Sequence, residues 1–106
     1  MAQAKASVVK YRVELTETAI QHIDNYRRFE RNVILERIRS ALGGEPAREG
    51  RNRKLLRENP LADWELRVGR FRVFYDVAEA ERVVSIVAVG HKERNTLLIG
   101  GEEFPL

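Results

Sequence analysis

The stretch that decides the fold is ELRVGRFRV, residues 65–73. Its middle residues, Gly69 and Arg70, fit the tight link of a β-hairpin, with glycine first as a type II′ turn prefers. In the register that such a turn imposes, Arg67 lies directly opposite Arg72 on the same face. Like charges in directly opposite positions destabilise a sheet, so the sequence predicts a hairpin whose arginine pair needs a physical explanation.

The residues that flank the turn separate by alternation into two sets. One set is almost wholly apolar: Trp64, Leu66, Val68, Phe71, Val73, Tyr75 and Val77. The other set is mixed: Glu65, Arg67, Arg72, Phe74 and Asp76. We expect the apolar set to pack under helices, and the mixed set to lie on a helix-free face that is at least partly open.

The sequence before the hairpin predicts one strand and two helices. The stretch VKYRVEL, residues 9–15, alternates apolar and polar residues as a half-buried strand does. Thr16 follows it as a candidate helix cap. Two apolar stripes with helical spacing cover residues 19–26 and 33–42, and Gly43 ends the second. Because the stripes lose phase between them, we expect two helices rather than one bent helix.

The remaining segments complete the predicted architecture. Residues 43–63 are polar and predict a loop, with a short helical turn around RKLLREN at 53–59. After the hairpin, RVVSIVAVG at 82–90 is apolar on both faces, as expected of a central strand. Residues 91–106 predict a turn or a short tail. The sequence therefore predicts one α+β domain, residues 1–106, with the order β-α-α-β-β-β and two helices on one face of a small twisted sheet.

Composition narrows the class of protein. A length of 106 residues suits one domain, and the absence of cysteine excludes disulfides and thiolate metal sites. No apolar run approaches the ~18 residues of a membrane span, and the N-terminus lacks the apolar core of a signal peptide. We therefore expect a cytoplasmic protein that does not use a membrane.

The positive charge is concentrated in one segment of a chain whose net charge is +3. The segment REGRNRKLLR, residues 48–57, carries arginines and a lysine against a single acid, Glu49. Such a segment attracts polyanions. The alternative for this segment taken alone is an ordinary solvated surface.

Two explanations of the arginine pair remain open from the residues alone. A phosphate bound between Arg67 and Arg72 would reverse their repulsion, because guanidinium groups match phosphate bidentately. Alternatively, Glu65 is close to both arginines and neutralises them. Without either, the pair costs up to roughly 1 kcal/mol relative to a neutral pair.

His91 and Lys92 follow the central strand, and we expect both to reach the edge of the sheet that carries Arg67 and Arg72. A histidine at a strand end is more often structural. Beside two candidate phosphate-binding arginines it becomes a candidate acid or base, because histidine titrates near neutral pH. His22 lies among polar neighbours in the first helix and receives no role.

Two stretches of the chain resemble the C-terminal half of the RelE/ParE toxin superfamily: WELRVGRFRVFYDV at 64–77 and VVSIVAVGHKERNTL at 83–97. The N-terminal YRVELTETAIQHI, residues 11–23, fits the same plan. The resemblance implies a small sheet with two helices, and a toxin of a bacterial or archaeal toxin–antitoxin module that a co-encoded antitoxin neutralises. RelE-like members cleave messenger RNA in the ribosomal decoding site, whereas ParE-like members inhibit DNA gyrase and are not nucleases.

The resemblance also implies catalytic positions. The basic residues of the family pattern fall on Arg67, Arg72 and Lys92, with His91 just before the last of them. These cations would stabilise the charge of a phosphorane-like transition state. His91 would protonate the leaving 5′-oxygen, or would share the acid and base duties with Glu65.

Two departures from the family pattern bear on activity. Leu98 stands near the place where many RNA-cleaving members carry a tyrosine, and no tyrosine follows the last strand. Glu65 stands at a strand position that is often basic in such members. Either change could weaken a nuclease, although an acid at Glu65 could instead serve as the base.

From the residues and the resemblance we expect a ribosome-dependent messenger RNA endoribonuclease that uses no metal and no cofactor. The expected RNA-binding side chains are Arg51, Arg53, Lys54, Arg57 and Arg70. The expected partners are messenger RNA on the ribosome and a cognate antitoxin that lays an amphipathic segment against the toxin in a hetero-oligomer. The alternatives are a ParE-like gyrase inhibitor without nuclease activity and a degenerate, inactive toxin retained as a repressor partner.

Overall fold

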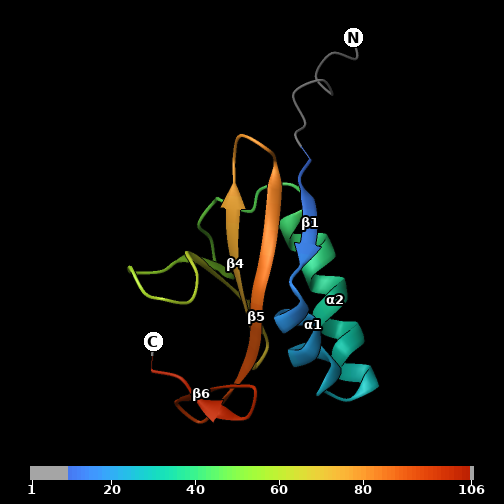
Figure 1. Cartoon of the computed structure of the whole chain (residues 1–106), viewed down its shortest axis with the longest axis vertical. Coiled ribbons are helices and arrows are strands. Elements are labelled where there is room, and N and C mark those ends of the chain that lie inside the picture. The colour runs from blue at the N-terminus through green and yellow to red at the C-terminus, as the bar shows by residue number, and fades with distance from the viewer. Residues whose placement is uncertain (1–9, 106) are drawn as a thin grey trace.

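A computed structural model describes residues 10–105. Figure 1 shows two helices packed against one side of a sheet. The elements in chain order are β1 (Arg12–Leu15), α1 (Glu17–Asp24), α2 (Arg28–Leu42), β2 (Arg53–Leu55), β3 (Trp64–Val68), β4 (Phe71–Ala78), β5 (Val83–Glu93), β6 (Thr96–Ile99) and β7 (Glu102–Glu103). The predicted α+β class is confirmed, with three short strands, β2, β6 and β7, added to the predicted order. No helix within residues 10–105 is long and apolar enough to cross a membrane.

Strand β5 organises the sheet. Along one edge it pairs antiparallel with β4. Along its other edge it first pairs parallel with β1, from Val83 to Ile86, and then antiparallel with β6, from Gly90 to Glu93. Strands β3 and β2 continue the sheet beyond β4, and β7 continues it beyond β6. Two different strands therefore share one edge of β5, and residues 87–89 pair with neither.

The predicted hairpin is confirmed in turn and in register. Gly69 has φ +59°, in the left-handed region that glycine adopts without a Cβ penalty. Strands β3 and β4 pair so that Arg67 lies opposite Arg72. The arginine pair that the sequence predicted is thus a feature of the sheet.

The two helices and their caps also follow the prediction. The backbone N–H of Ala19 donates to Oγ1 of Thr16 at 3.1 Å, which caps α1. The chain leaves helical structure between Asp24 and Arg28, and α2 ends before Gly43. The helices bury the apolar set of the hairpin in one core, whose fully buried members include Ile34, Leu42, Leu66, Val73, Tyr75 and Ile86. Only Val77 of that set stays partly exposed.

Two segments differ from their predicted structure. The helical turn expected around residues 53–59 is wrong, because Arg53–Leu55 forms β2 at the edge of the sheet against β3. The turn or short tail expected for residues 91–106 describes only part of that segment, because β5 runs on to Glu93 and two more strands follow, with turns between them. Residue 9, the first of the predicted N-terminal strand, lies outside the described residues.

The helix-free side of the sheet is partly covered. The loop after β2, residues 56–63, extends on the side of the sheet opposite the helices (Figure 1). A second, smaller core of Ala62, Phe74, Ala88 and Leu97 forms under it, with Phe104 packed alongside. Phe74 is fully buried there. The ring that the sequence placed on the open face is therefore not available to a ligand.

A β-bulge interrupts the alternation of β5. The register with β4 skips Val87, which has no partner on that strand. A bulge of this kind shifts every later side chain to the opposite face. Ile86 before it and Val89 after it both join the helix-side core, whereas Ala88 packs on the other side. Residues beyond the bulge therefore face the reverse of what plain alternation along the strand would give.

Replacing Tyr75 with phenylalanine should lower the free energy of unfolding by about 1–2 kcal/mol. The buried Tyr75 hydroxyl donates to the carbonyl oxygen of Pro46 at 2.8 Å, and burial raises the pKa of this tyrosine. The substitution leaves a buried carbonyl without its donor. Urea unfolding measures the change. Tyr11→Phe is the matched control, because the hydroxyl of Tyr11 donates to Glu79 at the surface; an equal loss in both variants would contradict the argument.

Candidate active site

An open groove of about 1000 Å³ lies on the helix-free side of the sheet. Its walls come from β2 and the loop after it, from β3 and β4 close to their turn, and from the segment that follows β5. Five cations line it: Lys54, Arg57, Arg67, Arg72 and Lys92. Three carboxylates line it as well: Glu58, Glu65 and Glu103. We name this surface the basic groove.

Glu65 lies between the two arginines of the hairpin. It is 6% exposed and is the buried charged residue of this region. Its Oε1 lies 3.5 Å from Nε of Arg67, and its Oε2 lies 3.7 Å from Nε of Arg72. Both distances are longer than a well-formed charge-assisted hydrogen bond. The acid therefore offsets the repulsion between the arginines while forming a close hydrogen bond with neither guanidinium group.

The two arginines differ in how firmly the fold holds them. Nη1 of Arg72 donates to the carbonyl oxygens of Gly69 and Phe71, at 2.7 and 2.9 Å, and its side chain is 14% exposed. Its buried Nε has no hydrogen-bond partner within the described chain. Burial lowers the pKa of Arg72, and the nearby Glu65 opposes that shift. Arg67 is 46% exposed and is the freer of the two.

Arg72 therefore lies on the helix-free side as expected, but the expectation that it is freely exposed to solvent there is wrong. Its guanidinium supports the turn of the hairpin through two backbone carbonyls, besides lining the basic groove. A substitution of Arg72 would change both the turn and the groove. Arg67 is the cleaner probe of the site.

Lys92 lines the basic groove and His91 does not. The expectation that both residues lie beside the arginines is confirmed for Lys92 and wrong for His91. The β-bulge at Val87 causes this difference. Past the bulge, the odd-numbered residues of β5 face the helices, and Lys92 takes the groove side. The backbone N–H of Lys92 donates to the carbonyl oxygen of Arg70 at 2.8 Å, which ties this part of β5 to the hairpin turn.

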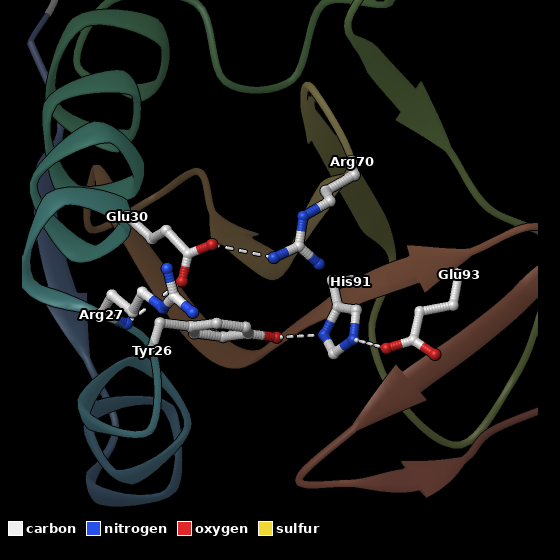
Figure 2. Close-up of polar contacts among 6 residues, drawn as sticks. All are labelled: Tyr26, Arg27, Glu30, Arg70, His91 and Glu93. Carbon is white, nitrogen blue, oxygen red and sulfur yellow. Dashed lines mark hydrogen bonds and ion pairs between the residues drawn. The ribbon is translucent and has the colours of Figure 1, made fainter.

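His91 instead belongs to a polar network on the helix side, drawn in Figure 2. Its Nδ1 lies 2.8 Å from the hydroxyl of Tyr26, and its Nε2 lies 3.0 Å from a carboxylate oxygen of Glu93. Burial raises the pKa of Tyr26 to about 12, so its hydroxyl keeps its proton. A neutral His91 accepts from that hydroxyl through Nδ1 and donates to Glu93 through Nε2. Both ring nitrogens are thereby engaged away from the basic groove.

Only some of the predicted RNA-binding residues line the basic groove. Lys54 and Arg57 line the basic groove. Arg53 donates to the backbone carbonyls of Arg48 and Ala41, so it serves the fold. Two others lie outside the groove lining: Arg70, which pairs with Glu30 at 2.8 Å (Figure 2), and the exposed Arg51.

Sequence reasoning missed the contribution of the C-terminal segment. Asn95 and Thr96 line the basic groove beside Lys92, and Phe104 lines it from beyond β7. The segment lacks the alternation that marks a strand, so it read as a tail. Its residues reach the groove because β6 folds back along the extended end of β5.

The basic groove has the chemistry of a site for a polyanion backbone. Guanidinium forks and ammonium groups bind phosphate oxygens without reading base identity. The buried carboxylate of Glu65 is the acidic group that lies within 4 Å of both arginines. Together these groups can hold a phosphodiester and offer it both positive charge and a proton acceptor.

Comparisons with known proteins agree with this architecture. A family model described as the ParE toxin of the type II toxin–antitoxin system parDE matches residues 13–96. A comparison with curated protein sequences gives no match.

Solved structures similar to the chain include three crystal structures. The toxin–antitoxin complex RelBE2 from Mycobacterium tuberculosis matches with TM-score 0.70 and 26% identity, over 79% of this chain and 93% of that one. The isolated Escherichia coli RelE toxin matches with TM-score 0.59 and 26% identity, over 79% and 86%. The archaeal RelE–RelB complex from Pyrococcus horikoshii shares the fold, with TM-score 0.65 and 23% identity over 81% and 99%. The chain therefore belongs to the ParE toxin family of type II toxin–antitoxin systems, within the RelE/ParE toxin superfamily.

Proposed function

We propose that this toxin is a ribosome-dependent endoribonuclease that cleaves messenger RNA without a metal ion. The observation that carries the proposal is the basic groove, whose lining on an accessible face combines five cations with the buried carboxylate of Glu65. Two similar structures at 26% identity contain RelE toxins, which supports a RelE-like activity over the alternatives. Such an activity would be exercised in the cytoplasm, where ribosomes translate.

The proposed reaction uses the groups of the groove as follows. Glu65 accepts the proton of a ribose 2′-hydroxyl, and the 2′-oxygen attacks the adjacent phosphorus. The bond from phosphorus to the 5′-oxygen breaks, and the ammonium of Lys92 protonates the leaving oxygen. The products are a 2′,3′-cyclic phosphate and a free 5′-hydroxyl. Arg67 and Arg72 stabilise the charge that develops on the phosphoryl oxygens, while Lys54 and Arg57 hold the flanking RNA backbone.

We also propose a co-encoded antitoxin as the resident partner, because two of the similar structures are toxin–antitoxin complexes. An antitoxin that covers the basic groove needs acidic side chains there. Electrostatic pairing of that kind weakens as salt screens it.

A second candidate function, inhibition of DNA gyrase, is favoured by two observations. His91 faces the helices, so the groove lacks the side chain that titrates closest to neutral pH. A surface that only binds a protein needs no general acid. The matching family model also carries the ParE description.

The test compares Arg67→Ala with Arg51→Ala, two substitutions that each remove one guanidinium. Arg67 lines the groove, whereas Arg51 is exposed outside it. Arg67→Ala should lower the rate of messenger RNA cleavage on purified translating ribosomes by about 10- to 100-fold, because a donor to the transition state is lost. Arg51→Ala should cleave at the rate of the unsubstituted toxin. Primer extension maps the cuts, and thermal unfolding verifies that both variants are folded.

Three results would reject the nuclease. If Arg67→Ala cleaves at the unsubstituted rate, the basic groove is not the active site. Induction of the unsubstituted toxin that breaks DNA and leaves messenger RNA intact would favour gyrase inhibition. A chain that neither arrests growth nor cleaves RNA would be the degenerate toxin retained as a repressor partner.

A further inference from the structure

One edge of β5 contains a gap between two partner strands. Pairing with β1 ends at Ile86, and pairing with β6 begins at Gly90. The bulge residue Val87 lies in this gap. A backbone N–H that points into such a gap has no ladder partner, and a buried N–H without a partner is costly.

The side chain of His22 reaches the backbone in this gap. Its Nδ1 accepts the backbone N–H of Val89 at 3.2 Å, from the last turn of α1. Burial lowers the pKa of His22, which favours the neutral ring that can accept a hydrogen bond. Because Nδ1 accepts, the proton of the neutral ring lies on Nε2. A Cβ added at Gly100 would lie 3.5 Å from that Nε2, so the β6–β7 turn closes the far side of the ring.

The bulge decides which residue enters the basic groove. Without it, plain alternation from Ile86 would turn Lys92 toward the helices and His91 toward the groove. With it, His91 reaches Tyr26 on the helix side and Lys92 lines the groove. The hydrogen bond from Val89 to His22 lies between the bulge and Lys92 along the strand, and so supports the register on which the groove depends.

We propose that His22 is a positioning residue: its Nδ1 holds the bulged register of β5 and thereby directs Lys92 into the basic groove. Sequence reasoning gave His22 no role, because its partner is a backbone N–H 67 positions away. The role of His22 depends on the proposed nuclease function only for its expected effect on RNA cleavage. The position of Lys92 is a structural property that can be measured without any substrate.

The test uses two substitutions with opposite properties. His22→Asn keeps an acceptor near the position of Nδ1 and loses ring volume. His22→Phe keeps the ring and loses the acceptor. The chain has four lysines, Lys5, Lys10, Lys54 and Lys92, so reductive ¹³C-methylation gives a small set of resonances from which Lys92 can be assigned. The readouts are the Lys92 methyl shift, the exchange rate of the Val89 amide and the rate of messenger RNA cleavage on ribosomes.

If the acceptor holds the register, His22→Phe should move the Lys92 resonance, speed Val89 exchange about tenfold or more, and lower cleavage about tenfold. His22→Asn should restore all three toward the unsubstituted values. A His22→Phe protein with unchanged Lys92 and Val89 signals would overturn the proposal, as would equal perturbation by both variants. If the unsubstituted toxin does not cleave RNA, the nuclease proposal fails alone, because the two spectroscopic readouts still decide the role of His22.

Discussion

Replacing Gly90 with alanine is expected to lower the free energy of unfolding by at least about 3 kcal/mol, at or above the upper end of ordinary overpacking. A Cβ at this position would collide with the backbone carbonyl oxygen of Leu98 and would lie 2.8 Å from Cγ1 of Ile99. The obstacle is backbone rather than the end of a flexible side chain. Gly90 is held on both edges, by Arg72 of β4 and by Ile99 of β6, so neither strand can move aside without losing its ladder.

Urea unfolding of Gly90→Ala beside Gly50→Ala measures this effect. Gly50 has nothing within 4 Å of an added Cβ, so its substitution should leave stability nearly unchanged or raise it slightly by reducing the entropy of the unfolded chain. Similar midpoints for the two variants would show that β6 does not approach β5 as closely as described. A folded Gly90→Ala protein should also lose the C-terminal wall of the basic groove, since β6 carries it.

The parts of the fold that the sequence predicts are those with a local signal. Gly69 predicts the hairpin, because the turn needs a residue with positive φ. Thr16 predicts the start of α1, because its hydroxyl accepts a backbone N–H of the first helical turn. Strand β2 has no such signal. Its three residues form a strand only because β3 offers a free edge, and the arginine that begins it donates to carbonyls 5 and 12 residues away in the chain.

The bulge in β5 could not be predicted for a different reason. The run VVSIVAVG is apolar on both faces, because one face packs under the helices and the other under the loop after β2. A one-residue slip in a strand of this kind leaves no trace in the hydrophobic pattern. The sequence therefore identifies His91 and Lys92 as neighbours of the arginine pair, yet it cannot say which of them enters the basic groove.

The sequence leaves two roles open for Glu65: it neutralises the arginine pair, or it also serves as the catalytic base. Because Glu65 is buried beside both arginines, substituting it distinguishes these roles. Its carboxylate approaches both arginines, so it offsets their repulsion and also opposes any phosphate between them. Neutralisation and catalysis therefore predict different results for the same substitution. If Glu65 only neutralises the arginines, its removal should strengthen RNA binding and leave cleavage intact. If it is also the base, cleavage should stop.

We expect Glu65→Gln to lower the free energy of unfolding by about 2–3 kcal/mol, because the largely buried Arg72 loses its counter-charge. Its affinity for a non-cleavable 2′-deoxy-substituted RNA should rise about tenfold, with a log–log salt slope steeper by about 0.7 as one more phosphate is neutralised. Cleavage on ribosomes should fall below detection, since glutamine cannot accept the 2′-hydroxyl proton.

Glu103→Gln is the matched control for this prediction. It removes the same charge from the same groove, at an exposed position on β7. It should preserve cleavage and stability while strengthening RNA binding less than Glu65→Gln, because solvent screens an exposed charge. Cleavage by Glu65→Gln at the unsubstituted rate would leave Glu65 only its role in neutralising the arginine pair. Loss of cleavage in both variants would instead show that the charge of the groove, and not a base at Glu65, controls the reaction.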